Sequence, residues 1–454
     1  MRRALALAAL ILAVLLAGFG GTLPAAHGVR LVSTAASLAR SGFVVQPEIA
    51  DPQCNGGRGA RLPGRLGGNA VLASATIADG STLIAFSNIY PGKRSVALRS
   101  VTSTCASNPE FGDDGAATIA IPSSLRPTDP AGEGFPTAGM WVNAIAPRNG
   151  GGAIVAGVYG GSWVVGEVTA QGTVDQTFGS DGWALLPLPG QVTAVLQEAS
   201  GRIVIAGDNG GAGCCTVNWA AALSEHGQLE AGFGAQGRAV LPTGEDSGVR
   251  SLALEPNGDI LADIGYGNMG CWGTSLAMLT PSGAPEPGFA QRLQRFWRAQ
   301  GFGAFIGDTY VDGEGFTVVG TGQKPCDDEP PGSTVPATGL MASFRTDGTP
   351  ARHAVRFRSR MYGSVQALPD GHGEILAETQ YADPTEITLT ALYPDGSTDP
   401  RFASHGSARI RTPWRGPNVT FSTTVSIDQA TPSEIVVVAT ESARSQVQLI
   451  RVRL

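Results

Sequence analysis

The feature that most constrains this chain is a pattern that returns along it, a turn glycine followed six residues later by phenylalanine. The full pattern occurs at Gly172/Phe178, Gly227/Phe233, Gly283/Phe289 and Gly396/Phe402. Cys105 and Phe111 fit the same frame with Cys in place of Gly, and Gly348 begins a degenerate copy of the repeat. The five intervals from Cys105 to Gly396 average about 58 residues, so the chain is built from repeated units of that length.

Each unit contains four short apolar runs that are bounded by turn-forming residues and are too short for helices. Tight turns between the runs predict antiparallel neighbours and therefore a four-stranded meander. One such sheet cannot bury both of its faces, and stacking copies around an axis solves this problem. We therefore predict an all-β fold, a seven-bladed β-propeller of four-stranded antiparallel blades, with one helix over 289–300.

The count of seven comes from two sets of runs. The first run of a unit begins near Asn69, Trp141, Val192, Val249, Gly303, Tyr362 and Thr423. The second run covers 82–86, 153–158, 203–206, 260–264, 316–319, 374–377 and 434–439. Residues 38–454 are thus expected to form a single propeller domain.

The two ends of this domain predict how the ring is closed. The chain ends on a third run, 447–454, and no fourth run follows it. Residues 38–45 match 178–185 in frame and form a fourth run that no first run precedes. We expect the N-terminal strand, with Phe43 and Gln46, to pair with the C-terminal blade, because such pairing removes an open sheet edge.

Residues 1–28 have the layout of a signal peptide, with Arg2 and Arg3 before an apolar run and small residues at its end. An uncleaved membrane anchor is the alternative, and it is the one route to a membrane that the sequence offers. The net charge of −7 argues against a nucleic acid partner. The expected protein is secreted or extracytoplasmic, and monomeric.

The repeats at 171–182 and 395–406 follow the pattern D-G-x-x-D-x-x-F-G-x-x-G, the first with Gln171 in place of the leading Asp and the second with Ala403 in place of the Gly after Phe. This pattern resembles the delta-60 repeats, a family of β-propeller units of bacterial secreted and surface proteins, and it is distantly similar to NHL propellers. The resemblance implies a fold and no activity, since the family has no assigned catalytic residues.

Two positions of the repeat have predicted structural roles. Phe178 and its equivalents are expected to fill the gap between neighbouring blades, where a large ring buries much apolar area. Asp175 and Asp399 are expected to accept hydrogen bonds from backbone N–H groups of the following turn.

Six cysteines in a chain with an export signal predict disulfides. Cys214, Cys215, Cys271 and Cys326 fall in loops between second and third strands, on one face of the ring. A bond between blades, such as Cys215 to Cys271, and a bond between the adjacent Cys214 and Cys215 both remain open. Cys54 and Cys105 are the remaining pair by elimination. We expect no metal and no cofactor, because zinc-ligand spacings are missing from the sequence.

The candidate binding residues are aromatic. Tyr90, Tyr159, Tyr266 and Tyr381 each follow the second strand of a unit, and Trp141 and Trp272 fall near the same face. Exposed tyrosine and tryptophan offer rigid amphipathic contact area for a glycan, peptide or protein. The alternative is that these rings pack under long loops as small cores.

No catalytic residue stands out, because the recognisable nucleophile, zinc and phosphate motifs are missing from the sequence. We expect a secreted binding or scaffolding propeller that is not an enzyme. The alternative is an extracytoplasmic lyase or hydrolase with a site at the axis. Carboxylates or histidines that converge at the axis would favour the enzyme, whereas an axis lined by Asn, Thr and backbone would favour binding.

Overall fold

A computed structural model describes most of the chain after residue 43. The described residues are 44–45, 50–54, 59–62, 70–87, 94–126, 140–209, 216–242, 247–268, 271–301, 304–312, 315–323, 338–351, 354–358, 365–369, 374–379, 386–393, 397–411, 423–431, 434–441 and 446–453. The predicted leader, 1–28, lies outside them.

Within these residues the strands form antiparallel sheets, which we number from 1 to 7 along the chain. Sheet 1 holds β3 (Ala70–Thr76), β4 (Thr82–Ser87), β5 (Ser95–Val101) and β6 (Ala116–Ala120). Sheet 2 holds β7 (Met140–Pro147), β8 (Ala153–Tyr159), β9 (Ser162–Val168) and β10 (Trp183–Pro189). Sheet 3 holds β11 (Gln191–Gln197), β12 (Ile203–Asp208), β13 (Asn218–Leu223) and β14 (Arg238–Val240).

Sheet 4 holds β15 (Ser247–Leu254), β16 (Ile260–Asn268) and β17 (Cys271–Leu279), followed by helix α3 (Phe289–Ala299). Sheet 5 holds β18 (Ala304–Asp312), β19 (Gly315–Gln323), β20 (Thr338–Phe344) and β21 (Val355–Arg358). Sheet 6 holds β22 (Val365–Pro369), β23 (Glu374–Thr379), β24 (Glu386–Leu392), β25 (Ser407–Arg411) and, at its edge, β1 (Val44–Val45). Sheet 7 holds β26 (Thr423–Thr431), β27 (Glu434–Glu441), β28 (Gln446–Arg453) and β2 (Ala60–Leu62).

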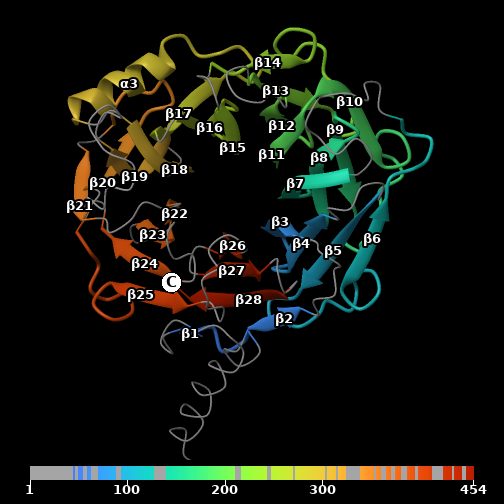
Figure 1. Cartoon of the computed structure of the whole chain (residues 1–454), viewed down its shortest axis with the longest axis horizontal. Helices are drawn as coiled ribbons and strands as arrows, with labels where there is room; N and C mark the ends of the chain where they lie inside the picture. Colours follow the sequence, from blue (N-terminus) through green and yellow to red (C-terminus); the bar gives the residue numbers. More distant parts are fainter. Residues whose placement is uncertain are drawn as a thin grey trace, which may run out of the picture.

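The sheets are arranged around a common centre, with the first strand of each sheet innermost (Figure 1). Sheets 7 and 1 come from opposite ends of the chain and are in contact through β26, β27 and β3. Both faces of the second strands are covered, so every residue of β8 is buried and its sequence is continuously apolar. The protein is therefore an all-β structure of mostly four-stranded antiparallel sheets. All the predicted first and second runs, and the predicted helix, are confirmed as elements in their sheets.

The recurring Gly and Phe contact each other across neighbouring units. Phe178 is buried between sheets 2 and 3, as predicted. Gly227, the turn glycine of the next unit, lies on the Phe178 ring: a Cβ there would be 2.8 Å from the ring. The backbone N–H of Gly179 also donates to the carbonyl of His226 at 2.9 Å. The same pairing joins Gly172 to Phe111, Gly283 to Phe233 and Gly348 to Phe289.

The predicted role of the repeat aspartates is confirmed. The backbone N–H of Thr177 donates to Asp175 Oδ1 at 3.0 Å, and the N–H of Arg401 donates to Asp399 Oδ1 at 2.9 Å. Asp175 also receives Arg148 Nη2 at 2.5 Å. These carboxylates therefore hold the turn that precedes the fourth strand.

The predicted place of the N-terminal strand is wrong in its residues. Val44 and Val45 pair with Arg411 and Ile410 of β25, so they form a fifth strand of sheet 6. The strand that pairs with β28 is β2, from Ala60 opposite Leu449 to Leu62 opposite Val447. The physical reason is a repeat motif that starts later: 51–54 reads Asp-Pro-Gln-Cys, in frame with Asp-Pro-Arg-Phe at 399–402.

Candidate functional site

We call the end of the sheets at which the first strands begin the front end. In sheet 3, Gln191 begins β11 and faces Asp208 at the end of β12, which in turn faces Asn218 at the start of β13. In sheet 2 the corresponding row contains Trp141 and Val158. The loops between second and third strands leave from this end, so it is the face on which the sequence predicted a ligand.

A chain of polar side chains crosses from sheet 2 to sheet 3 at the front end. Asn143 Nδ2 donates to Gln191 Oε1, and Gln191 Nε2 donates to Asp208 Oδ2, each at 3.2 Å. The indole Nε1 of Trp163 donates to the Asp208 carbonyl at 3.3 Å. Asp208 is buried, whereas Asn143 and Gln191 are partly exposed. These groups offer amide and carboxylate functions at the inner rim.

The inner strands carry β-bulges at this rim, and the bulged residues join the sheets. The register shifts between Val142 and Ala144 in β7, and between Val192 and Ala194 in β11. The side chain of Asn143 donates to the carbonyl of Val192 in the next sheet, at 3.2 Å. A bulge frees backbone groups from the ladder, and the neighbouring polar side chain satisfies one of them.

Thr193 makes an equivalent contact from sheet 3 to sheet 4. It lies in the bulge of β11, and its Oγ1 donates at 2.7 Å to the carbonyl of Val249, which precedes the bulge of β15. The paired second strands carry glycine because a Cβ at Gly157 or Gly207 would lie under 2 Å from a β7 or β11 carbonyl oxygen, at 1.8 and 1.9 Å. The backbones of the first and second strands therefore lie too close together at this end for any side chain at these two positions.

The structure places four of the six aromatic candidates at the front end. Trp141 is partly exposed in β7. Tyr266 belongs to β16 and Trp272 to β17, near the end at which these two paired strands meet. Tyr90 and Tyr381 lie outside the described residues. Tyr159 is the correction: the residue is 3% exposed, so it is part of the core and not an exposed contact residue.

Tyr159 is buried because its ring completes the core between sheets 1 and 2. The Arg94 guanidinium lies over it, 5.7 Å from the ring centre, and shields its remaining face. The alternative prediction, a ring packed into a core, describes this residue.

The structure tests one of the cysteine predictions, and the others depend on residues outside those described. The Cys54–Cys105 disulfide is present, and its two residues are buried. Cys271 lies in the backbone of β17 opposite Asn268, at the front end. Cys214, Cys215 and Cys326 lie outside the described residues, so both pairings of these cysteines stay predictions.

Carboxyl groups with shifted pKa values lie at the opposite end of the sheets, where they hold turns. Burial raises the pKa of Glu167, against the lowering effect of Arg148, 2.9 Å away. Hydrogen bonds from Thr177 lower the pKa of Asp175, and those from Arg401 lower the pKa of Asp399. These shifts have structural causes, so they do not mark a second site.

No group of three His, Cys, Asp or Glu side chains in the described ranges is placed to hold a metal ion. Among the helices of these ranges, none has the length and apolar character needed to cross a bilayer.

Sequence reasoning missed Asn143, Gln191 and Asp208. A frame signal was present: Gln191 occupies the position of Trp141 relative to the following Val, and Asp208 follows the Ala-Gly end of its strand. Their contact depends on the register between sheets, which no pattern within one unit reveals.

No protein-family model and no curated protein sequence matches the chain. Solved structures similar to it include polysaccharide lyase Uly1, with 10% identity, a TM-score of 0.47, and coverage of 85% of this chain and 91% of that one. The Dos1 propeller has 9% identity, a TM-score of 0.46, and coverage of 86% and 93%. The Nup133 β-propeller domain of Vanderwaltozyma polyspora has 9% identity, a TM-score of 0.41, and coverage of 90% and 98%. None of these similarities bears on the activity of this chain.

Proposed function

We propose that the chain is a secreted, closed seven-bladed β-propeller of the delta-60 type, and that it acts as a binding or scaffolding module without catalysis. The sheets 1 to 7 are its blades. Closure is supported by the β2–β28 pairing, and by one buried cluster with members from sheet 6 (Ile410), sheet 7 (Val437) and sheet 1 (Phe86). A location outside the cytoplasm is supported by the disulfide.

The observation that carries the binding function is the polar chain at the front end beside the partly exposed Trp141. Amide groups in fixed orientation next to an aromatic ring are suited to the hydroxyls and flat faces of a glycan, or to peptide groups. The ligand docks on the front end, over β7 and β11.

The test uses two glutamines of one strand. The purified protein is screened on glycan and peptide arrays, and the best ligand is titrated against Gln191→Ala and Gln197→Ala. Gln191 begins β11 at the front end and Gln197 ends it at the opposite end. We expect Gln191→Ala to weaken binding about tenfold, the value of one lost hydrogen-bonding group, and Gln197→Ala to leave it unchanged.

The opposite ranking of the two variants would place the ligand on the other face. Release of new reducing ends or amines from the bound ligand, with loss of that release in Asp208→Asn, would make the protein an enzyme and overturn the proposal.

A further inference from the structure

The segment 50–62, described at 50–54 and 59–62, is here called the N-terminal arm, and its contact with β28 is called the seam. Residues 51–54 of the arm make the same backbone hydrogen bonds as the turn at 175–178 of sheet 2. Asp51 N–H donates to the Arg451 carbonyl at 3.3 Å, and Cys54 N–H donates to the Asp51 carbonyl at 3.2 Å. In sheet 2, Asp175 and Phe178 make the same bonds, at 2.9 Å to Glu167 and 3.1 Å to Asp175.

Two further features agree with this alignment. Gln53 N–H donates to Asp51 Oδ1 at 3.1 Å, as Thr177 does to Asp175. Ala50 forms a bridge with Val452, as Val174 does with Val168. Cys54 therefore stands at the position of Phe178.

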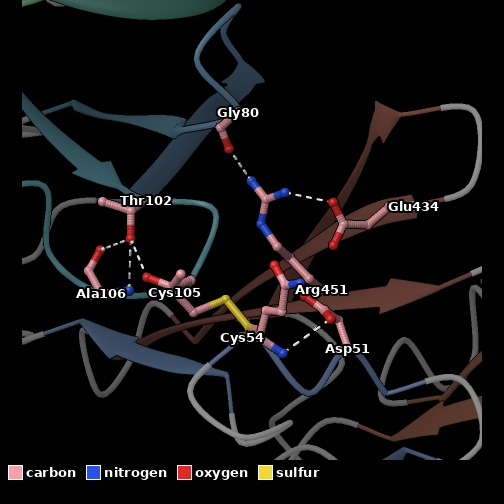
Figure 2. The surroundings of a disulfide bond; sticks show 10 residues. Asp51, Cys54, Gly80, Thr102, Cys105, Ala106, Glu434 and Arg451 are labelled. Atoms are coloured by element: carbon pink, nitrogen blue, oxygen red, sulfur yellow. Dashed lines mark hydrogen bonds and ion pairs between the residues drawn. A yellow bond between two sulfur atoms is a disulfide. The ribbon is translucent and has the colours of Figure 1, made fainter.

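Cys105 stands at the position of the turn glycine. It has a φ of 61°, in the left-handed region that glycine favours, and its N–H donates to the Thr102 carbonyl at 2.9 Å. Gly172 has a φ of 77° and donates to Thr169 at 3.0 Å. The contact between Phe of one unit and Gly of the next is thus replaced, between sheets 7 and 1, by the Cys54–Cys105 disulfide (Figure 2).

This difference matters at the seam, because β28 and β2 are not consecutive in the chain and no turn connects them. At the four junctions from sheet 1 to sheet 5, a phenylalanine ring of one unit packs on the turn glycine of the next. Cys54 is much smaller than phenylalanine, so without its bond the described part of the arm is held by the short β2 ladder, the Ala50 bridge, its turn bonds and the Arg453 bond to the Ala50 carbonyl. Arg451 fixes β28 independently of the disulfide: it pairs with Glu434 at 2.7 Å and donates to the Gly80 carbonyl.

We propose that the Cys54–Cys105 disulfide is a redox-controlled lock on the seam. The oxidised pair holds the arm against sheet 1 as the edge on which β28 docks, and the reduced chain releases β28. Locking removes two electrons and two protons from the thiols and passes them to a disulfide oxidant, which leaves as two thiols. This inference rests on the proposed ring closure.

The experiment compares hydrogen exchange in three proteins: the oxidised chain, Cys54→Ser/Cys105→Ser, and Cys54→Phe/Cys105→Gly. The last variant introduces the Phe and Gly found at the four junctions from sheet 1 to sheet 5. We expect exchange at 446–453 to be about tenfold faster in the serine variant, and within about twofold of the oxidised chain in the Phe/Gly variant. Exchange at 153–168, in β8 and β9, serves as the control and is expected to stay unchanged.

Each other outcome overturns a specific statement. Slow exchange at 446–453 in both the oxidised chain and the serine variant would overturn the lock and leave ring closure standing. Fast exchange already in the oxidised chain would overturn ring closure, and the lock with it. Faster exchange at 153–168 as well as at 446–453 would show a general loss of folding, and it would also overturn the lock.

Discussion

Two constraints fix the residue type at Gly227. Its φ of 76° lies in the left-handed region, which costs an L-residue with a side chain roughly 1–2 kcal/mol. The Phe178 ring also occupies the space that a Cβ would need. The repeat therefore couples its two most visible residues across a junction, although they stand in different units.

This coupling predicts unequal effects for the same substitution at two glycines. Gly150 has a similar φ of 84°, but nothing lies within 4 Å of its Cβ position. We expect Gly150→Ala to lower the free energy of unfolding by about 1 kcal/mol and Gly227→Ala by about 3 kcal/mol, because only the latter displaces a packed ring. Urea unfolding measures both values, and equal losses would refute the ring contact.

The Asp175 carboxylate predicts a dependence on pH. Its pKa is lowered from 3.8 in the folded chain, chiefly by hydrogen bonds from Thr177, so its stabilisation is complete above pH 3.8 and disappears as the pH falls through the folded value. We expect Asp175→Asn to cost about 1 kcal/mol at pH 7 and less at pH 2, because protonation of the carboxylate removes part of its contribution. Urea unfolding at both pH values measures this.

A matched background locates the cause of that effect. Thr177 Oγ1 donates to Asp175 Oδ1 at 2.7 Å. In Thr177→Val the cost of Asp175→Asn at pH 7 is expected to shrink, and an unchanged cost would assign the effect to Arg148 instead.

At the scale of elements, α3 is the departure from the repeat. Sheet 4 has three strands, and the helix follows them from Phe289, the position that precedes the fourth strand in other units. Leu293 and Trp297, one turn apart, are buried with it, and Trp297 packs edge-on against Phe344 of sheet 5 at 5.6 Å. The helix therefore adds apolar contact between sheets 4 and 5, beside strand residues such as Leu276 and Phe316.

Removing one ring of this helix tests that function. We expect Trp297→Ala to lower the free energy of unfolding by about 3 kcal/mol, because it empties a nearly buried site. Gln294→Ala, on the exposed side of the same helix, is the control and is expected to change it by less than about 0.5 kcal/mol. Circular dichroism melts compare them. A small effect of Trp297→Ala would mean that sheet contacts alone hold this junction.

The elements differ in how far the sequence could predict them. First and second strands were found because turn residues and apolar runs mark them locally, as at 203–208 and 260–264. The arm was misplaced because Cys54 occupies the position at which phenylalanine marks the frame, and because Val44–Val45 forms a strand of its own at the edge of sheet 6. The Asn143–Gln191–Asp208 chain was missed since it depends on the register between two sheets.

At the scale of the whole molecule, the arm and β28 are far apart in the sequence and meet in sheet 7. The Ala50–Val452 bridge corresponds to the Val168–Val174 bridge of sheet 2, but in sheet 2 a short turn, 169–173, joins the two bridged residues. The arm and β28 are thus two halves of an ordinary unit whose turn is missing. The packing of this sheet therefore does not depend on which of its strands comes first in the chain.

A circular permutant tests this statement. Val452 is joined to Ala50 through a copy of the turn 169–173, and new ends are opened between the exposed Asn149 and Gly150. We expect a folded protein in which exchange at 446–452 is slower than in a linear control of residues 50–454, and no longer depends on the Cys54–Cys105 bond, because continuous chain replaces the lock. A permutant that fails to fold, or that exchanges at 446–452 as fast as the reduced linear control, would show that the arm and β28 do not form one unit.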